Sequence, residues 1–484
     1  MGYVVIYAQF PKRWGAYMKF EYVQCKEDIQ KYAVLPLIDK YLTGLPIFNP
    51  EVYCYGKRRS DFIPPNIIAK ATSLMQSLAL TSYAKIEELN SNTIFTSIVG
   101  NSISQESFRQ KLDDISKTIG LDKIIDDSNI ELLRSANIDT VWYAGKEYYT
   151  LDIDVTPFIN EDCNKEGVSY TYKRKDGYAP IMGYLGEYGL AYDLRPGSQH
   201  SEKGAVEFLN RCISLTDRLG IQRSNILLRV DSGHDATKFI NACLNLNINF
   251  ILKKNIRNKN VFLREWMPYV KRNIRPEINE DNGVKIYRYI DENKPYGIKS
   301  ENLKQLNVFI EEISNDNKQL RFPVLPTDDL FGREPWINYS VESYITNIKI
   351  FDNEFKECTD QNKYIIECVN IYRDHATCEQ FHSEEKTDMN MELLPSKYFK
   401  TNAFILQLSV LAFNVLRILG NLALINDSSF QHHKYPIISR IRIKTVIEKI
   451  CNIPCKVAKH ARKIVLKIGK YCKVFKIYKK NYNL

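Results

Sequence analysis

The chain has 484 residues, 44% hydrophobic and 26% charged, an ordinary globular balance with enough apolar material for a core and, by length, for two to four domains. Its eleven cysteines form no C-x2-C pair and are odd in number, which argues against a disulfide framework or a zinc site and indicates reduced thiols in a cytosol. The net charge of +10 favours a polyanion as partner.

The first part of the chain predicts helices after a short, irregular start. The beginning lacks the basic and apolar pattern of a leader, so we expect no signal peptide. Ile67–Leu89 and Ser104–Ile119 have helical periodicity, and Ser104 is a suitable N-cap. These segments predict a helical domain over residues 65–140, although a small packing domain would have the same pattern.

The next part predicts a mixed sheet. Tyr148–Thr156 alternates in the manner of a strand and contains Asp152 and Asp154 near its end, and Tyr178–Tyr188 and Gly189–Leu194 predict a hairpin. A helix at 202–219, a strand Ile226–Val230 closing at Asp231, a helix at 236–246 and a strand Asn249–Lys253 follow. This is the order of the RNase H-like fold, in which the strands before Asp154 and Asp231 are central neighbours.

Residues 255–360 predict a β-rich insertion between the last sheet strand and a later helix. Its β-like runs are Val284–Ile290, Leu306–Ile313 and Tyr344–Ile350. Trp266 and Trp336 fit two roles, stacking on an unpaired base or packing in a core.

The stretch from Tyr372 to Lys386 predicts a helix, because it has no Pro or Gly and its apolar residues recur at helical spacing. Offsets of three, four and seven place Tyr372, His375, Glu379 and Lys386 on one face of that helix. Such a face suits a metal ion and a phosphate; an amphipathic surface helix is the other interpretation.

This spacing resembles the signature helix of the DDE transposases of the IS4-like group, Tyr-x2-Arg-x3-Glu-x6-Lys. With His375 in the Arg position and Glu379-Gln380-Phe381-His382 following, it is similar to the IS1380 family. Asp154-Val155-Thr156 resembles the first acid motif of the group, and Leu227–Gly233 resembles the second. By strand alternation Asp152 faces the same side as Asp154, so either acid can be the first.

The resemblance implies that Asp154, Asp231 and Glu379 are catalytic and hold two Mg²⁺ ions, for which Mn²⁺ substitutes. Clustered carboxylates need cations to stay ionised, and two Mg²⁺ ions suit an in-line displacement at phosphorus. Water is expected to free a DNA 3′-OH at the element end, and that 3′-OH then attacks target DNA.

DNA contacts are expected around the three acids. The resemblance assigns phosphate and DNA-end contacts to Tyr372, His375 and Lys386, with ordinary packing as the alternative for the first two. Lys253 and Lys254 follow a sheet strand and are expected to contact the DNA backbone.

The C-terminal part predicts a buried helix and a basic tail. The apolar run at 403–425 is interrupted by Gln407, Asn414, Arg417 and Asn421, so we expect a core helix and no membrane span. Residues 431–484 carry 15 Lys or Arg and one acid, a net +14, while the rest of the chain sums to −4. This tail is expected to track DNA backbone; a solvated tail or an anionic membrane contact are the alternatives.

Together these features predict an α/β protein with an RNase H-like catalytic core, interrupted by a β-rich insertion and flanked by a helical N-terminal DNA-binding domain and a basic helical C-terminal tail. The predicted segments are 1–64 (N-terminal), 65–140 (DNA-end binding), 145–254 (first core part), 255–360 (insertion), 361–430 (second core part with the glutamate helix) and 431–484 (basic tail).

The resemblance implies a DNA transposase that acts on terminal inverted repeats and target DNA, as a homodimer on paired ends, in a bacterial cytoplasm at the nucleoid. A two-metal nuclease of the same fold without strand transfer, and an inactive DNA-binding relic, are the alternatives.

Overall fold

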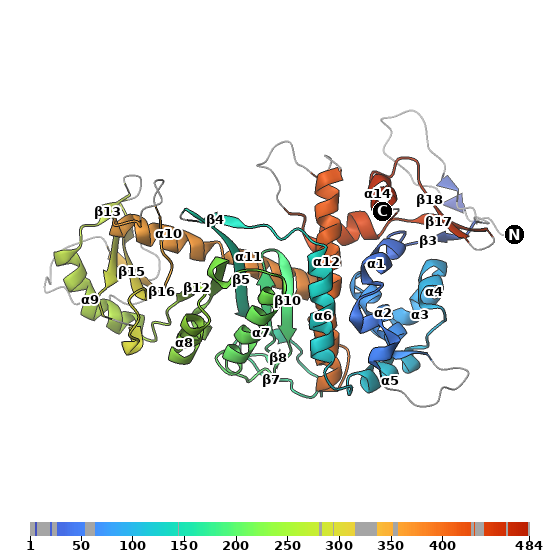
Figure 1. Cartoon of the computed structure of the whole chain (residues 1–484), viewed down its shortest axis with the longest axis horizontal. Coiled ribbons are helices and arrows are strands. Elements are labelled where there is room, and N and C mark those ends of the chain that lie inside the picture. Colours follow the sequence, from blue (N-terminus) through green and yellow to red (C-terminus); the bar gives the residue numbers. More distant parts are fainter. Residues whose placement is uncertain are drawn as a thin grey trace.

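The computed structural model of the protein describes residues 5–6, 20–21, 27–53, 63–143, 145–279, 283–293, 295–314, 336–351, 357–426, 430, 440–460 and 463–482. Figure 1 shows an elongated molecule with strands at its centre, helices of the first 134 residues on one side, and a helix and strands of residues 259–314 on the other. The long helix α12 (Phe399–Asn426) stands between the central strands and the N-terminal helices.

The centre of the sheet is the mixed arrangement that the sequence predicts. The strand order is β10-β9-β5-β11-β12, with β5 antiparallel to β9 and parallel to β11. These elements are β5 (Lys146–Val155), β9 (Ile181–Leu185), β10 (Tyr188–Asp193), α7 (Ala205–Arg218), β11 (Ile226–Val230), α8 (Thr237–Asn245) and β12 (Asn249–Lys253). All five residues of β11 are buried, as expected of a parallel strand covered on both faces. The predicted mixed α/β class is confirmed.

The hairpin of β9 and β10 turns earlier than predicted. The turn lies at Gly186, which has φ +59 and donates its N–H to the carbonyl of Thr150 at 2.8 Å. Gly189, the predicted turn residue, lies in β10, where a Cβ atom would come within 2.3 Å of the Tyr192 hydroxyl and 2.8 Å of Val410. The second glycine therefore serves close packing against α12, and the first serves the turn.

The predicted insertion does not form a separate sheet. Its four described strands add to the five of the central sheet in the order β12-β16-β15-β14-β13, because β16 pairs antiparallel with β12. The sequence also missed a helix there. The elements are α9 (Lys259–Asn273), β13 (Glu277–Ile278), β14 (Lys285–Asp291), β15 (Lys304–Ser314) and β16 (Trp336–Thr346). Trp266 on α9 stacks on Phe262 and Tyr289, as in the packing alternative, whereas the side chain of Trp336 lies outside the described residues.

Two small strand groups flank β5. Strand β4 (Val141–Tyr143) pairs with its beginning, and a three-stranded sheet in the order β6-β8-β7 follows its end. These strands are β6 (Phe158–Ile159), β7 (Ser169–Tyr170) and β8 (Asp176–Tyr178).

The predicted N-terminal helices share a core with the sheet, because α12 packs against them on one side and against β10 on the other. The helices on this side are α1 (Leu35–Leu42), α2 (Pro65–Gln76), α3 (Lys85–Asn90), α4 (Thr93–Val99), α5 (Gln105–Ile115) and α6 (Leu121–Arg134). The predicted segment Ile67–Leu89 is divided between α2 and α3, and α1 was not predicted. Ser104 caps α5 by accepting the N–H of Ser107 at 3.2 Å, as predicted.

Helix α12 is the one helix of the described part that is long and apolar enough to cross a membrane, and 78% of its most apolar window is buried inside the protein. Its polar residues have partners. Asn414 donates to Asn129 and accepts the N–H of Gly189, both at 2.8 Å, and Arg417 donates to the carbonyl of Ile441 at 2.9 Å. The helix is therefore part of the protein core.

The described residues of the basic C-terminal segment are folded. They include α13 (Ile443–Val446), a π-helical turn (Ile447–Cys451), β17 (Cys455–His460), β18 (Lys463–Ile468) and α14 (Phe475–Tyr482). Strand β17 pairs with β3 (Ile29–Gln30), and α14 packs against α1. The two ends of the chain thus lie together (Figure 1), where a short pair β1 (Val5–Ile6) and β2 (Phe20–Glu21) also lies.

Candidate active site

Two of the predicted acids lie side by side at the ends of neighbouring strands. Strands β5 and β11 run parallel, with Ile153 opposite Val230, and the next residue on each strand is the aspartate, Asp154 or Asp231. Adjacent strands lie about 4.8 Å apart, so the two carboxylates start from neighbouring backbone positions. This is the arrangement that the order of the sequence motifs predicts.

Asp154 is held by its own backbone and by a histidine. Its Oδ1 accepts the N–H of Val155 at 2.7 Å, and its Oδ2 lies 3.3 Å from Nε2 of His382. Burial would raise the pKa of Asp154, but the hydrogen bond and charge of His382, together with His375, lower it below its usual value. The carboxylate is therefore ionised at neutral pH.

Asp231 begins a short 3-10 helix, Ser232–His234. Its Oδ1 accepts the N–H of Gly233 at 3.0 Å and lies 3.0 Å from Nδ1 of His234. His234 is fully buried, and its Nε2 has no partner among the described residues. The aspartate side chain itself is 44% exposed. The histidine thus fixes one carboxylate oxygen and leaves the other toward solvent.

Glu379 lies on α11 (Ala376–Ser383), exposed, and no hydrogen bond or ion pair to a described residue holds it. The charges of Glu379 and of the two aspartates act on the same two tyrosines. Burial, followed by the charges of Asp154, Asp231 and Glu379, raises the pKa of Tyr172 to about 12. Burial and the same three charges, with that of Glu342, also raise the pKa of Tyr372. All three acids therefore lie within electrostatic reach of both rings.

The predicted helix 372–386 consists of three pieces, and this part of the prediction was wrong. Helix α10 (Gln361–Arg373) ends before Asp374, α11 follows, and a π-helix, Glu384–Asp388, completes the stretch. The break occurs where Asp374 accepts from the hydroxyl of Tyr143 and His375 turns inward. The predicted residues consequently do not share one face of a single helix.

His375 turns toward Asp152, the alternative first acid. Asp152 is fully buried and receives two hydrogen bonds from Arg229, both 2.7 Å, and lies 2.8 Å from Nδ1 of His375. Burial would raise the pKa of Asp152, but Arg229 and His375 lower it to about 2. Both oxygens are engaged, so Asp152 is a structural carboxylate. His375 is buried beside it, as in the packing alternative, and its contact with DNA stays a prediction.

The predicted DNA-binding lysines all have protein partners. Lys386 donates to the carbonyl of Pro157 at 2.7 Å and lies 3.0 Å from Glu392. Lys253 pairs with Glu342 at 2.8 Å. The ammonium group of Lys254 lies 4.1 Å from the ring centre of Tyr296, and burial lowers its pKa. Their contacts with DNA remain a prediction.

Sequence reasoning missed three residues at the acids, namely His234, His382 and Tyr172. His234 follows Asp231 by three residues, a spacing that favours a contact within a tight turn. His382 follows Glu379 by three residues, and it contacts Asp154 from α11. Tyr172 carries no signal in the sequence, because the pairing of β6, β8 and β7 places it there.

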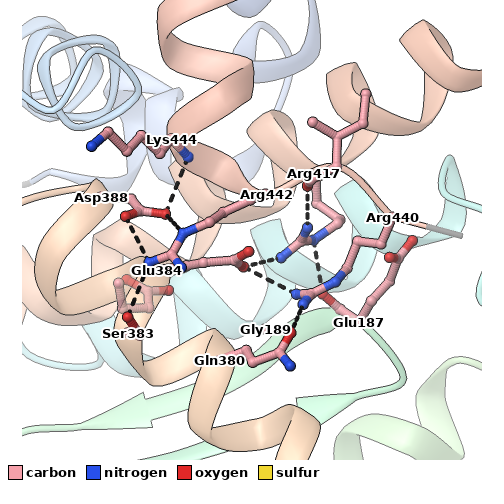
Figure 2. A network of polar contacts seen from close by, with 12 residues as sticks. Glu187, Gly189, Gln380, Ser383, Glu384, Asp388, Arg417, Arg440, Arg442 and Lys444 are labelled. Atoms are coloured by element: carbon pink, nitrogen blue, oxygen red, sulfur yellow. Dashed lines mark hydrogen bonds and ion pairs between the residues drawn. The ribbon is translucent and has the colours of Figure 1, made fainter. Parts of the chain in front are cut away.

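A buried polar network holds the chain just beyond Glu379, as Figure 2 shows. Glu384, 1% exposed, forms ion pairs with Arg417 of α12 and with Arg440, and Arg440 also donates to Gln380 at 2.6 Å. The guanidinium of Arg440 lies 4.6 Å from the ring centre of Phe381. Arg440 therefore contacts the residue next to Glu379.

A second arginine extends this network. Arg442 donates to both oxygens of Asp388, at 2.7 and 3.1 Å, and to the hydroxyl of Ser383 at 3.1 Å (Figure 2). The backbone N–H of Lys444 adds a bond to Asp388 at 3.2 Å. The start of the basic C-terminal segment is thus bonded to the π-helix that follows the glutamate helix, and π-helical turns are frequent at functional sites.

The donor set of the three acids fits Mg²⁺. Among the described residues, no group of three or more His, Cys, Asp or Glu side chains is close enough to hold one metal ion together. Mg²⁺, however, is usually held by one or two carboxylates, with water and substrate phosphate completing its shell. Oδ2 of Asp231 and both oxygens of Glu379 have no hydrogen-bond partner in the described part of the chain, so they are free to bind a cation.

Comparison with known proteins gives one family. Residues 75–291 match the family model described as Transposase DDE domain group 1, a segment that includes Asp154 and Asp231 and ends before Glu379. Among solved structures, the chain is similar to the cryo-EM structure of the piggyBac transposase synaptic complex with hairpin DNA, with 11% identity, a TM-score of 0.38, and coverage of 87% of this chain and 81% of that chain. No curated protein matches the chain. The family match supports a transposase of the DDE type.

Proposed function

We propose that this protein is a DNA transposase that cleaves the ends of a mobile element and transfers them to target DNA. The observation that supports the proposal is that Asp154 and Asp231 follow paired residues of the parallel strands β5 and β11, with Glu379 exposed on α11. The match of residues 75–291 to a DDE transposase family supports it. Within that class, the spacing from Tyr372 to Lys386 favours the IS4-like group and its IS1380 family.

In this proposal the three acids hold two Mg²⁺ ions, with Mn²⁺ as a substitute. When bound, such ions activate an attacking oxygen and stabilise the leaving one in a displacement at phosphorus. His382 and His234 orient the carboxylates of Asp154 and Asp231. Two further contacts keep the glutamate helix in position, that of Arg440 with Gln380 and that of His375 with Asp152.

The substrate is double-stranded DNA, as terminal inverted repeats and as target. The basic C-terminal segment supplies charge for its backbone, with steep salt dependence and little choice of sequence. We expect a homodimer on paired ends, acting in a bacterial cytoplasm at the nucleoid, because cut-and-paste transposition joins two ends.

The test is Asp231→Ala in a cleavage assay on element-end DNA with Mg²⁺ or Mn²⁺. We expect DNA binding to survive and cleavage to disappear, because Asp231 lies at the cluster with one oxygen open to solvent. Asp122→Ala, an exposed acid on α6, is the matched control and should cleave like the wild type. Unchanged cleavage by Asp231→Ala would refute the site.

The same experiments distinguish the transposase from the two alternatives, a nuclease and a DNA-binding relic. A nuclease of this fold would cleave but would fail to join pre-cut ends to target DNA. A DNA-binding relic would hold the terminal repeats and never nick them with either metal.

A further inference from the structure

One loop beside Asp154 takes no part in the proposed chemistry. It joins β7 to β8 as Thr171-Tyr172-Lys173-Arg174-Lys175. Strand β8 pairs with β6, which begins three residues after Val155, the last residue of β5. The hydroxyl of Tyr172 lies 3.4 Å from the carbonyl oxygen of Val155. The loop therefore stands at the end of β5, next to Asp154.

The charges of all three acids act on Tyr172 of this loop. After burial, the charges of Asp154, Asp231 and Glu379 are the causes that raise its pKa. The residue is nevertheless 65% exposed, and Tyr170, two residues earlier, is 61% exposed. Two aromatic faces are therefore open to solvent beside a cluster of three carboxylates.

The loop is braced by its own backbone. The N–H of Thr171 donates to the carbonyl of Lys175 at 2.9 Å, its hydroxyl donates to the same oxygen at 2.8 Å, and the N–H of Arg174 donates back to Thr171 at 2.9 Å. Its base is tightly packed: a Cβ atom at Gly177 would lie 2.1 Å from the carbonyl oxygen of Phe158. The backbone of such a turn is held in place before a ligand arrives, which lowers the entropy lost on binding.

The tip of the loop has positive charge without protein partners. Lys173 and Arg174 are exposed, and neither forms an ion pair or hydrogen bond through its side chain with a described residue. Lys253 and Lys386, the lysines expected to contact DNA, are instead paired with Glu342 and Glu392. The unpaired cations near the acids thus include two on this loop.

We infer that Tyr170–Lys175 is a DNA-contacting loop that holds the strand beside the scissile phosphate; this inference rests on the proposed function. Three carboxylates repel a phosphate backbone, and two adjacent cations offset that repulsion where the strand enters the site. An exposed tyrosine ring stacks on an unpaired base or a sugar without selecting a sequence. Lys173 and Arg174 bind the backbone, and Tyr172 fixes the strand against the acids.

The test uses full-length protein and the variant Lys173→Ala/Arg174→Ala. Binding to a short duplex of random sequence is measured over a range of salt concentrations. Removing two phosphate contacts should reduce the slope of log affinity against log salt by about 1.8. Arg264→Ala/Lys363→Ala removes the same charge at exposed positions on α9 and α10 and should leave the slope unchanged. The exchange Lys173→Arg/Arg174→Lys keeps both charges and should restore wild-type binding.

Two further measurements make the test specific to the site. Tyr172→Ala should weaken binding of a single-stranded oligonucleotide about tenfold, whereas Tyr172→Phe, which keeps the ring, should not. Single-turnover cleavage of element-end DNA, started from bound complexes, should slow in the Lys173/Arg174 variant. A variant whose melting temperature equals that of the wild type is folded.

The outcomes separate this inference from the proposed function. If the wild type cleaves DNA and the Lys173/Arg174 variant keeps its salt slope and cleavage rate, the loop inference is overturned alone. An equal loss in the Arg264/Lys363 control also overturns it, because the effect is then one of net charge. If the wild type never cleaves, the proposed function fails, and the salt slope still decides whether the loop binds DNA.

Discussion

Two sets of acids lie within one sheet and its neighbouring helices, and they differ in what surrounds them. Asp152 and Glu384 are buried, and arginine side chains meet their carboxylates. Asp231 and Glu379 are open to solvent and keep oxygens without protein partners. A buried carboxylate needs an internal cation, so the first set stabilises the fold. The second set leaves negative charge available to an external cation.

Glu379→Gln gives the largest expected effect, on activity alone. Loss of a carboxylate that holds a metal ion should slow metal-dependent cleavage about 10³-fold, equivalent to about 4 kcal/mol of transition-state stabilisation. The melting temperature should not change, because no described residue bonds to this side chain. Glu131→Gln, exposed on α6, is the control in the same single-turnover assay. Cleavage at the wild-type rate would show that Glu379 does not hold a metal ion needed for the reaction.

Arg229→Ala tests the buried set. It leaves Asp152 as an uncompensated charge in the core, and breaking such a pair costs about 3–5 kcal/mol of unfolding free energy. Chemical denaturation measures this loss. In the matched control, Arg223→Ala breaks an exposed pair with Asp217 and should cost less than about 1 kcal/mol. Equal losses in the two variants would contradict the division into buried and open acids.

Glu385 sharpens the comparison through pH, because it is a buried acid whose environment favours the neutral form. Burial raises its pKa to about 8, and the charge of Glu384 adds to this, against the hydrogen bond from Tyr192. The folded protein therefore keeps a proton that the unfolded chain loses above its ordinary value of 4.5. The contribution of Glu385 to stability must fall as pH rises from 4.5 to about 8.

The variant Glu385→Gln should lose this dependence. The difference in unfolding free energy between variant and wild type should grow in favour of the variant by up to about 1.4 kcal/mol per pH unit. Urea denaturation over that pH window measures it. A difference that stays flat with pH would show that Glu385 is ionised in the folded protein.

Lys386→Ala has the smallest expected effect. Its pair with Glu392 is partly exposed, so stability should change by less than about 1 kcal/mol. If Lys386 exchanges Glu392 for a phosphate when DNA binds, the salt slope of binding should fall by about 0.9. An unchanged slope would assign Lys386 to the bond with Pro157 and the pair with Glu392 alone.

The sequence predicts the two aspartates at the strand ends better than it predicts their surroundings. Asp154 and Asp231 each follow an apolar strand, so their place at one sheet edge follows from local pattern and strand order. The choice between Asp152 and Asp154 does not, because it depends on Arg229 and His375 reaching Asp152 from other elements. Alternation along a strand assigns a face, and partners far along the chain decide which acid is neutralised.

The helix around Glu379 shows the same limit. Its periodicity predicts one continuous helix, but the helix is interrupted at Asp374, which accepts from the hydroxyl of Tyr143, and at His375, which lies 2.8 Å from Asp152. Likewise, the sequence predicts strands in the insertion but not their partners, and its last strand β16 pairs with β12. Local composition shows the helix or strand propensity of a segment and the spacing of its residues. It carries little information about which distant segments pair.

The most direct measurement is the binding of Mn²⁺ to the full-length protein, followed by the loss of the free-ion signal in electron paramagnetic resonance. The wild type and Asp122→Asn should bind the ion, whereas Asp154→Asn, Asp231→Asn and Glu379→Gln should each weaken binding while leaving the protein folded. Binding of equal strength in all five proteins would contradict a shared metal site at these three carboxylates.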